Sequence, residues 1–86
     1  MSVDDIKKLL DSGKLVFGTN LTLKFLKEGK VAKVYIAKNV PERVSEDLEY
    51  YNELTDFELI KLEVYNKELG YLCRKPFSVA VIGVLN

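Results

Sequence analysis

The last patterned segment of this 86-residue chain contains no polar side chain. It reads Val79-Ala80-Val81-Ile82-Gly83-Val84-Leu85 and is rich in β-branched residues, which favour strands. A strand that is apolar on both faces must be covered on both faces, as the interior strands of α/β proteins are. The sequence therefore predicts a central, doubly covered strand over 79–85, and this constrains the rest of the fold.

Helical and strand patterns alternate along the rest of the chain, and residues that favour helix ends separate them. Ser2 with Asp5 resembles a capping box. Thr19 and Asn66 are N-cap candidates for later helices, and Gly29 suits the end of the second helix. The predicted helices cover 3–11, 19–28, 43–54 and 66–73, and the predicted strands cover 14–17, 32–37, 58–64 and 79–85.

This alternation around a central apolar strand predicts an α/β fold, a three-layer α/β/α sandwich with a mixed four-stranded sheet. The length suits one domain over residues 1–86. In the third helix, Val44, Leu48 and Tyr51 recur at helical spacing and should face the sheet. Its glutamates should then face solvent.

Charge is distributed unevenly, although 13 basic and 13 acidic residues leave a formal net charge of zero. Residues 15–41 hold five lysines against one glutamate, whereas residues 42–68 hold nine acidic residues against three basic ones. We expect one basic and one acidic side. A basic side is what a nucleic-acid-binding protein needs, but two ordinary solvated faces would give the same pattern.

Several function classes are disfavoured by composition. The chain has no histidine and a single cysteine, Cys73, so the usual zinc-ligand sets, a Cys-His or Ser-His nucleophile and an internal disulfide are absent. Glu46 and Asp47 are adjacent and would point in different directions on a helix. We therefore expect no enzyme activity, no metal, no cofactor and no small-molecule substrate, and a core position for Cys73.

Targeting signals are absent as well. No stretch reaches the roughly 20 apolar residues that span a bilayer, and the first residues lack the basic and apolar regions of a signal peptide. The expectation is a soluble, cytoplasmic protein without a membrane partner.

The junction Gly18–Lys24 carries the clearest binding signature. A glycine turn followed by a helix start exposes free backbone N–H groups and the positive end of a helix dipole, where phosphate can dock. A helical projection with Leu26 in the core places Asn20, Leu21 and Lys24 together on the solvent face. Two plainer interpretations stay open: Asn20 bonding its own backbone, and Lys24 as an ordinary surface lysine.

Three segments resemble the L30e family of large-subunit ribosomal proteins of archaea and eukaryotes: Ser12–Gly18, Ser45–Tyr51 and Glu68–Val79. That family belongs to the L7Ae superfamily of kink-turn RNA-binding proteins. The resemblance covers nearly the whole chain and implies an α/β/α sandwich without catalysis. It also implies binding of a kinked RNA internal loop with tandem sheared G·A pairs, within the large ribosomal subunit.

The resemblance further implies that the glycine turn and the next helix enter the RNA groove at the kink. The loop before the last strand would cover an extruded nucleotide, and Phe77 could stack on an unpaired base or else begin the core of the last strand. In the other branch of the superfamily a glutamate stands where this chain has Leu21, which cannot read G·A pairs. The implied RNA-binding residues are Lys14, Gly18, Thr19, Asn20, Leu21, Lys24, Lys38, Asn39, Arg74, Lys75, Pro76 and Phe77.

Three functions fit these observations. The first is an RNA-binding component of the large ribosomal subunit, and the second is a stand-alone kink-turn binder outside the ribosome. The third is a protein-interaction domain that uses Leu21, Leu23 and Phe77 as a small apolar contact patch. RNA binding should weaken steeply with salt. Binding through the apolar patch should not, and it should be lost in a Leu21→Lys variant.

Overall fold

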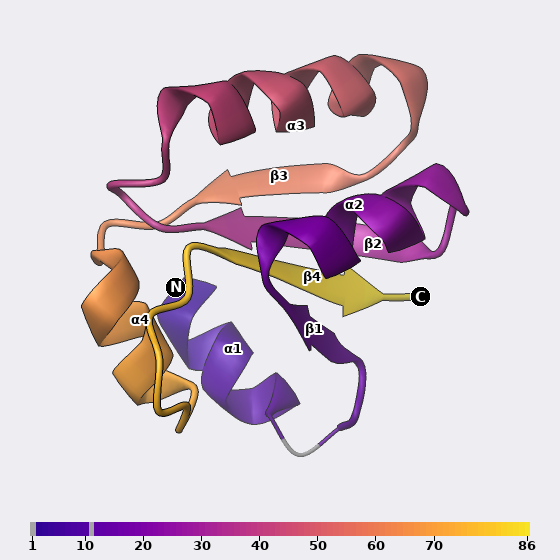
Figure 1. The fold of residues 1–86 in the computed structure, drawn as a ribbon. Coiled ribbons are helices and arrows are strands. Elements are labelled where there is room, and N and C mark those ends of the chain that lie inside the picture. The colour runs from indigo at the N-terminus through magenta and orange to yellow at the C-terminus, as the bar shows by residue number, and fades with distance from the viewer. Residues whose placement is uncertain (1, 11) are drawn as a thin grey trace.

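The computed structural model describes residues 2–10 and 12–86, and Figure 1 shows helices and strands alternating along the whole chain. Every predicted element is present, with shifted ends. The side chains of the predicted Ser2–Asp5 capping box lie outside the described residues. The elements are α1 (Ser2–Leu9), β1 (Leu15–Phe17), α2 (Thr19–Lys27), β2 (Val31–Ile36), α3 (Glu42–Leu54), β3 (Glu58–Lys61), α4 (Asn66–Leu72) and β4 (Val81–Leu85).

The four strands form one mixed sheet in the order β1-β4-β2-β3. Strand β4 runs antiparallel to both of its neighbours, while β2 and β3 are parallel. Val81, Ile82, Gly83 and Val84 are all buried. The central, doubly covered strand that the apolar run predicts is therefore confirmed, and so is the mixed four-stranded sheet.

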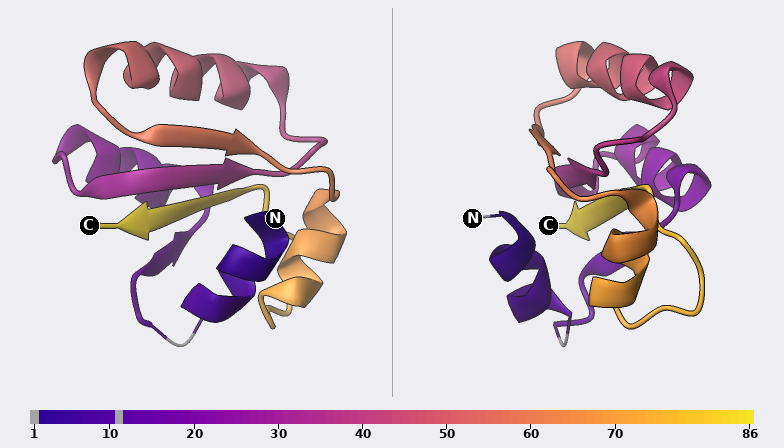
Figure 2. Two further views of the ribbon diagram at one scale, coloured as in Figure 1. Left: turned by 180° about the vertical axis from the view of Figure 1, so that it is seen from behind. Right: turned by 90° about the vertical axis from the view of Figure 1, so that its left-hand side faces the viewer.

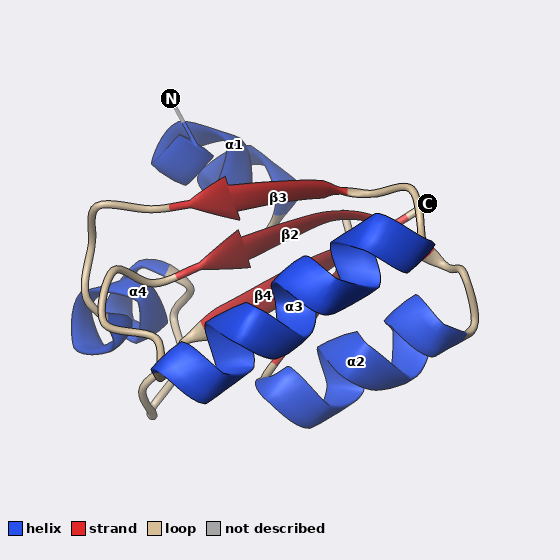
Figure 3. Ribbon diagram, turned by 90° about the horizontal axis from the view of Figure 1, so that it is seen from above, coloured by secondary structure: helices blue, strands red, loops and turns tan. Residues whose placement is uncertain are grey.

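Helices cover both faces of this sheet. Helices α2 and α3 lie side by side across one face, and α1 and α4 cover the other (Figures 2 and 3). Neighbouring residues of β4 serve opposite layers, because successive side chains of a strand alternate in direction. Val81 packs in the cluster that holds Leu26 and Leu48, whereas Ile82 packs in the cluster that holds Leu69. The predicted three-layer α/β/α sandwich is confirmed.

Helix α3 presents the faces that its spacing predicts. Leu48 is fully buried, and Val44 and Tyr51 pack partly buried against the same cluster. Glu46 and Glu49 are exposed. Within residues 2–10 and 12–86, no helix combines the length and apolar character needed to cross a bilayer.

The predicted capping role of Thr19 is wrong. The residue before α2 is Gly18, at φ 103° and ψ 153°, and Thr19 is already helical, without a side-chain cap on this helix. The chain leaves β1 through a backbone conformation that only glycine adopts easily. Gly29 ends the helix as predicted, at φ 71° directly after the C-cap Glu28.

The predicted capping role of Asn66 is also wrong. Helix α4 begins at Asn66 itself, and its first N–H is satisfied by another segment. The Asn66 N–H donates to Asn39 Oδ1 at 2.9 Å, and Asn39 Nδ2 donates to Asn66 Oδ1 at 3.1 Å. This reciprocal pair ties the start of α4 to the turn after β2.

The last two strands are shorter than the ranges 58–64 and 79–85 predict. Strand β3 ends at Lys61, and Val64 instead accepts a bond at 2.8 Å from the backbone N–H of Lys38. Strand β4 begins at Val81, because the Val79 N–H donates to the Asn66 carbonyl at 3.1 Å. Both departures tie the chain to the loops at one end of the sheet.

Candidate nucleic-acid interface

Three loops meet at one end of the sheet because of strand direction. Strands β1 and β2 end there and β4 begins there, since Phe17 pairs with Ile82, and Ile36 pairs with Val81. The loops β1–α2, β2–α3 and α4–β4 are therefore neighbours, although they lie far apart in the sequence (Figure 1). These loops carry most of the residues predicted to bind RNA.

The β1–α2 junction is fixed by backbone hydrogen bonds. The Gly18 N–H donates to the Val81 carbonyl at 2.9 Å, and the Gly18 carbonyl accepts the Thr22 N–H at 3.2 Å to start α2. A Cβ on Gly18 would meet no atom within 4 Å. The position requires glycine for its positive φ rather than for space.

The outward face of α2 agrees with the helical projection. Asn20, Leu21 and Lys24 are exposed, while Thr22 and Leu26 are buried. Leu21 leaves 48% of its surface in solvent. Across residues 2–10 and 12–86, the side-chain hydrogen bonds involve neither Asn20 nor Lys24. The amide and the ammonium are therefore available to a ligand.

The α4–β4 loop leaves the helix through a Schellman motif. Cys73 is the C-cap, and the next residue, Arg74, has φ 60°. The Arg74 N–H donates to the Tyr71 carbonyl and the Lys75 N–H to the Gly70 carbonyl, each at 3.0 Å. Glycine usually occupies the left-handed position of this motif, so an arginine there is unusual.

Gly70 lets the same loop lie directly on α4. A Cβ placed on Gly70 would overlap the Phe77 carbonyl oxygen and would come within 3.2 Å of the Ser78 Cα. The loop backbone therefore rests on the helix at this glycine. Its position depends on the absence of a side chain.

Lys75 joins this loop to the β1–α2 junction. Its Nζ lies 4.5 Å from the centre of the Phe17 ring, a cation–π contact one residue before Gly18. Phe77 leaves 57% of its surface exposed, which excludes the alternative that it begins the core of the last strand. The exposed ring of Phe77 thus lies on a loop that contacts the strand directly before α2.

The β2–α3 loop contributes a second pair of predicted residues. Lys38 is exposed, and its Nζ lies 5.8 Å from the centre of the Tyr65 ring. Asn39 has both ends of its amide bonded to Asn66. Asn39 therefore ties this loop to the start of α4.

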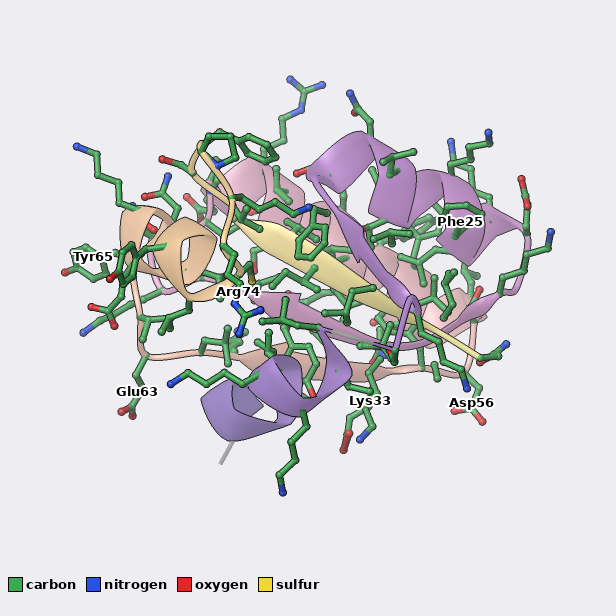
Figure 4. The ribbon with its side chains drawn as sticks, turned by 90° about the horizontal axis from the view of Figure 1, so that it is seen from below. Phe25, Lys33, Asp56, Glu63, Tyr65 and Arg74 are labelled. Carbon is green, nitrogen blue, oxygen red and sulfur yellow. The ribbon has the colours of Figure 1, made fainter. Side chains whose placement is uncertain are left out.

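Two predicted residues lie apart from the others. The Lys14 carbonyl accepts the Leu85 N–H at 2.8 Å, at the far end of β4. Along an extended strand, this places Lys14 about 13 Å from Gly18. Arg74 extends toward α1 in Figure 4, into a groove between α1 and α4, rather than toward the start of α2.

Sequence reasoning missed the residues that position this surface. Phe17 and Asn66 make their contacts with segments far away in the sequence, so no local pattern reveals them. Gly70 had one local signal, because a glycine inside a helical pattern often marks close packing.

The chemistry of this surface suits an anionic, base-bearing ligand. A free amide lies at the start of α2, and cations and an exposed ring lie on the neighbouring loops. A shallow hollow of about 320 Å³ lies next to Phe77. Within the described ranges, no group of three or more histidine, cysteine, aspartate or glutamate residues could hold a metal ion. Burial raises the pKa of the Cys73 thiol above its ordinary value, partly offset by the charge of Lys75.

Comparisons of the sequence with known proteins find similarity to one family of ribosomal proteins. Residues 3–86 match the model of the family described as "Ribosomal protein L7Ae/L30e/S12e/Gadd45 family". The chain is 37% identical to the large ribosomal subunit protein eL30 of Methanocaldococcus jannaschii, over 94% of this chain and 74% of that protein. It is 38% identical to eL30 of Sulfolobus acidocaldarius, over 95% of this chain and 79% of that protein.

Solved structures agree on the fold. A 15.5 kD RNA-binding protein of Giardia lamblia superposes with a TM-score of 0.86 at 20% identity, over 99% of this chain and 71% of that one. A protein of unknown function from Bacillus halodurans superposes with a TM-score of 0.87 at 17% identity, over 98% of this chain and 83% of that one. At these identities, the likeness concerns the fold alone.

Proposed function

Because the chain belongs to the ribosomal protein L7Ae/L30e/S12e/Gadd45 family, we propose that it is an RNA-binding protein of the large ribosomal subunit. Its ligand is a kink-turn RNA internal loop. The observation that carries this proposal is the meeting of the β1–α2 and α4–β4 loops, joined by the contact of Lys75 with Phe17 at 4.5 Å. This junction brings helix N–H groups, cations and an exposed aromatic ring onto one surface.

In this proposal, the start of α2 faces the RNA groove at the kink. The N–H groups near Thr19 and Asn20 lie at the positive end of the helix and meet a phosphate. The Asn20 amide offers a donor and an acceptor to a base edge, and Lys24 donates to guanine or to phosphate. Leu21 packs against a sugar or base face and contributes no polar readout.

The α4–β4 loop covers an extruded nucleotide. Pro76 and Phe77 provide apolar surface beside the 320 Å³ hollow, and base–aromatic stacking is worth about 1–3 kcal/mol per base. Lys75 bridges the two loops and adds charge. Lys38 extends the basic surface on the β2–α3 side.

The archaeal eL30 relatives support the ribosomal part of this proposal, and the proposed location is the cytoplasm, on ribosomes. We expect the protein purified from its source to comigrate with large ribosomal subunits on a sucrose gradient. A protein found only in the light fractions would favour a kink-turn binder outside the ribosome. We assign the chain no catalytic role.

The RNA assignment is tested with two duplexes of equal length, one with a kink-turn internal loop and one fully paired. We expect tighter binding to the kinked RNA. A Lys24→Ala variant should lose about 1–3 kcal/mol of binding free energy if Lys24 contacts a base edge. Fluorescence anisotropy at fixed salt measures both quantities.

A Glu49→Ala variant is the control, because Glu49 lies exposed on α3 and pairs with Lys61 at 3.3 Å. It should bind the kinked RNA as the parent does. Equal losses in the two variants would show that the docking face is wrong. Equal affinity for both duplexes would overturn kink-turn recognition.

A further inference from the structure

A second basic groove lies beside the proposed RNA surface, between the ends of α1 and α4. We name it the α1–α4 groove; it has a volume of about 520 Å³. Three of its lining side chains are cationic. Among the residues that the structure describes, no acidic side chain lines the groove. The lining residues are Lys7, Leu10, Tyr71, Leu72, Arg74 and Lys75.

The groove adjoins the hollow beside Phe77. Tyr71 and Lys75 line both of them, and Tyr71 is 82% exposed. The two hollows are therefore adjacent, and a ligand that lies beside Phe77 can extend over Tyr71 to reach the groove. Figure 4 shows Arg74 extending toward α1 on this side of the molecule.

Arg74 lines the groove from a strained backbone conformation. Its φ of 60° is the left-handed position of the Schellman motif, where glycine is favoured and other residues are strained. Such strain at a non-glycine residue is typical of positions held for function. The backbone alone gives no reason for an arginine here, whereas a ligand for its guanidinium does.

From these observations we propose that the α1–α4 groove binds the phosphate backbone of the RNA stem that flanks the kink. The polar groups of the groove are mainly cations, which recognise phosphates without regard to sequence. Tyr71 adds an aromatic face for a ribose edge. The proposal rests on the proposed function in one respect only, the placement of the RNA on the α4–β4 loop.

The test is a Lys7→Ala/Arg74→Gly double variant. Lys7 is exposed on α1, and glycine suits the left-handed position of Arg74 better than arginine does. The variant should therefore fold with stability equal to or above that of the parent. Urea unfolding checks this, and it distinguishes a binding defect from a folding defect.

The probe is a kink-turn RNA with short stems, compared with the same RNA whose stems are extended by about one helical turn. Salt dependence is measured as the slope of the logarithm of the binding constant against the logarithm of the salt concentration. On the extended RNA, this slope should become less steep by about 0.9 for each phosphate that the variant no longer neutralises, or about 1.8 for two phosphates. Affinity at low salt should fall on the order of tenfold. On the short RNA, the double variant should bind as the parent does.

The control is a Lys27→Ala/Lys30→Ala variant, which removes two exposed lysines at the other end of α2 and the following turn. It should keep the salt dependence of the parent on the extended RNA. An unchanged salt dependence in the Lys7→Ala/Arg74→Gly variant would overturn the proposal. So would equal losses on the short and extended RNAs, which would place both cations at the kink.

Failure of the proposed function would look different. In that case the unmodified protein would bind a fully paired duplex as tightly as the kinked RNA. The effect of the Lys7→Ala/Arg74→Gly variant would then be measured on the paired duplex. A weaker salt dependence there would support the groove as a phosphate-binding surface, and an unchanged one would refute it.

Discussion

Cys73, at the end of α4, is a buried thiol. It is 3% exposed, in the cluster that α1 and α4 build against the sheet, as a small core residue should be. Burial disfavours the charged thiolate and raises the pKa of the thiol, and the Lys75 charge opposes this only in part. The thiol should therefore react slowly while the protein is folded.

The same shift predicts a dependence of stability on pH. The native thiol keeps its proton above the ordinary pKa of 9.0, at which the unfolded chain loses it. The contribution of this thiol to the free energy of unfolding is therefore complete below pH 9 and is lost as pH rises through the higher native pKa. Urea unfolding at pH 8 and pH 10 should show a larger loss in the parent than in a Cys73→Ala variant. Equal losses would contradict the account.

Single residues were predicted well where helical periodicity alone decides. The exposure of Asn20 and Lys24 follows from one helical projection that takes Leu26 as the core position. The caps were predicted wrongly because the deciding partner lies elsewhere. Asn39, from another loop, satisfies the start of α4, and the backbone of Gly18 determines where α2 begins.

At the scale of elements, the α4–β4 loop depends on the contact between Gly70 and the Phe77 carbonyl. Helix propensity alone would make a Gly70→Ala variant more stable by roughly 0.5–1 kcal/mol. The overlap with the loop backbone should outweigh this gain, since overpacking costs about 1–3 kcal/mol. We expect thermal unfolding at a lower temperature and weaker binding of kinked RNA.

A Glu68→Ala variant is the matched control, because Glu68 is exposed on the same helix. It should bind kinked RNA at least as well as the parent. If Gly70→Ala raises the unfolding temperature and leaves RNA affinity unchanged, the loop does not depend on this contact.

Element types follow from the sequence, but their pairing does not. The apolar run predicts that β4 is central, and the alternation predicts helices on both faces. Neither pattern contains the order β1-β4-β2-β3, which depends on contacts between segments far apart in the chain. The adjacency of the β1–α2 and α4–β4 loops follows from that order. The sequence therefore predicts the candidate residues but not that these two loops lie side by side.

For the whole molecule, the charge distribution is compatible with the proposed RNA surface. The glutamates of α3 are exposed, whereas Lys38 and Lys75 lie on the loops described above and Lys24 lies on the exposed face of α2. An uneven charge distribution steers a polyanion toward the basic side even at zero net charge. Under the proposed function, we expect kinked RNA to be the preferred ligand of this basic side.

The most direct test of this account is an amide chemical-shift titration of the protein with kink-turn RNA. At 9.8 kDa, the protein is well suited to this measurement. We expect the largest shift changes in residues 18–24 and 75–78, with small changes over residues 46–54 of α3. Two results would contradict the account. One is that the largest shift changes fall along α3, and the other is that kink-turn RNA causes no larger changes than a fully paired duplex does.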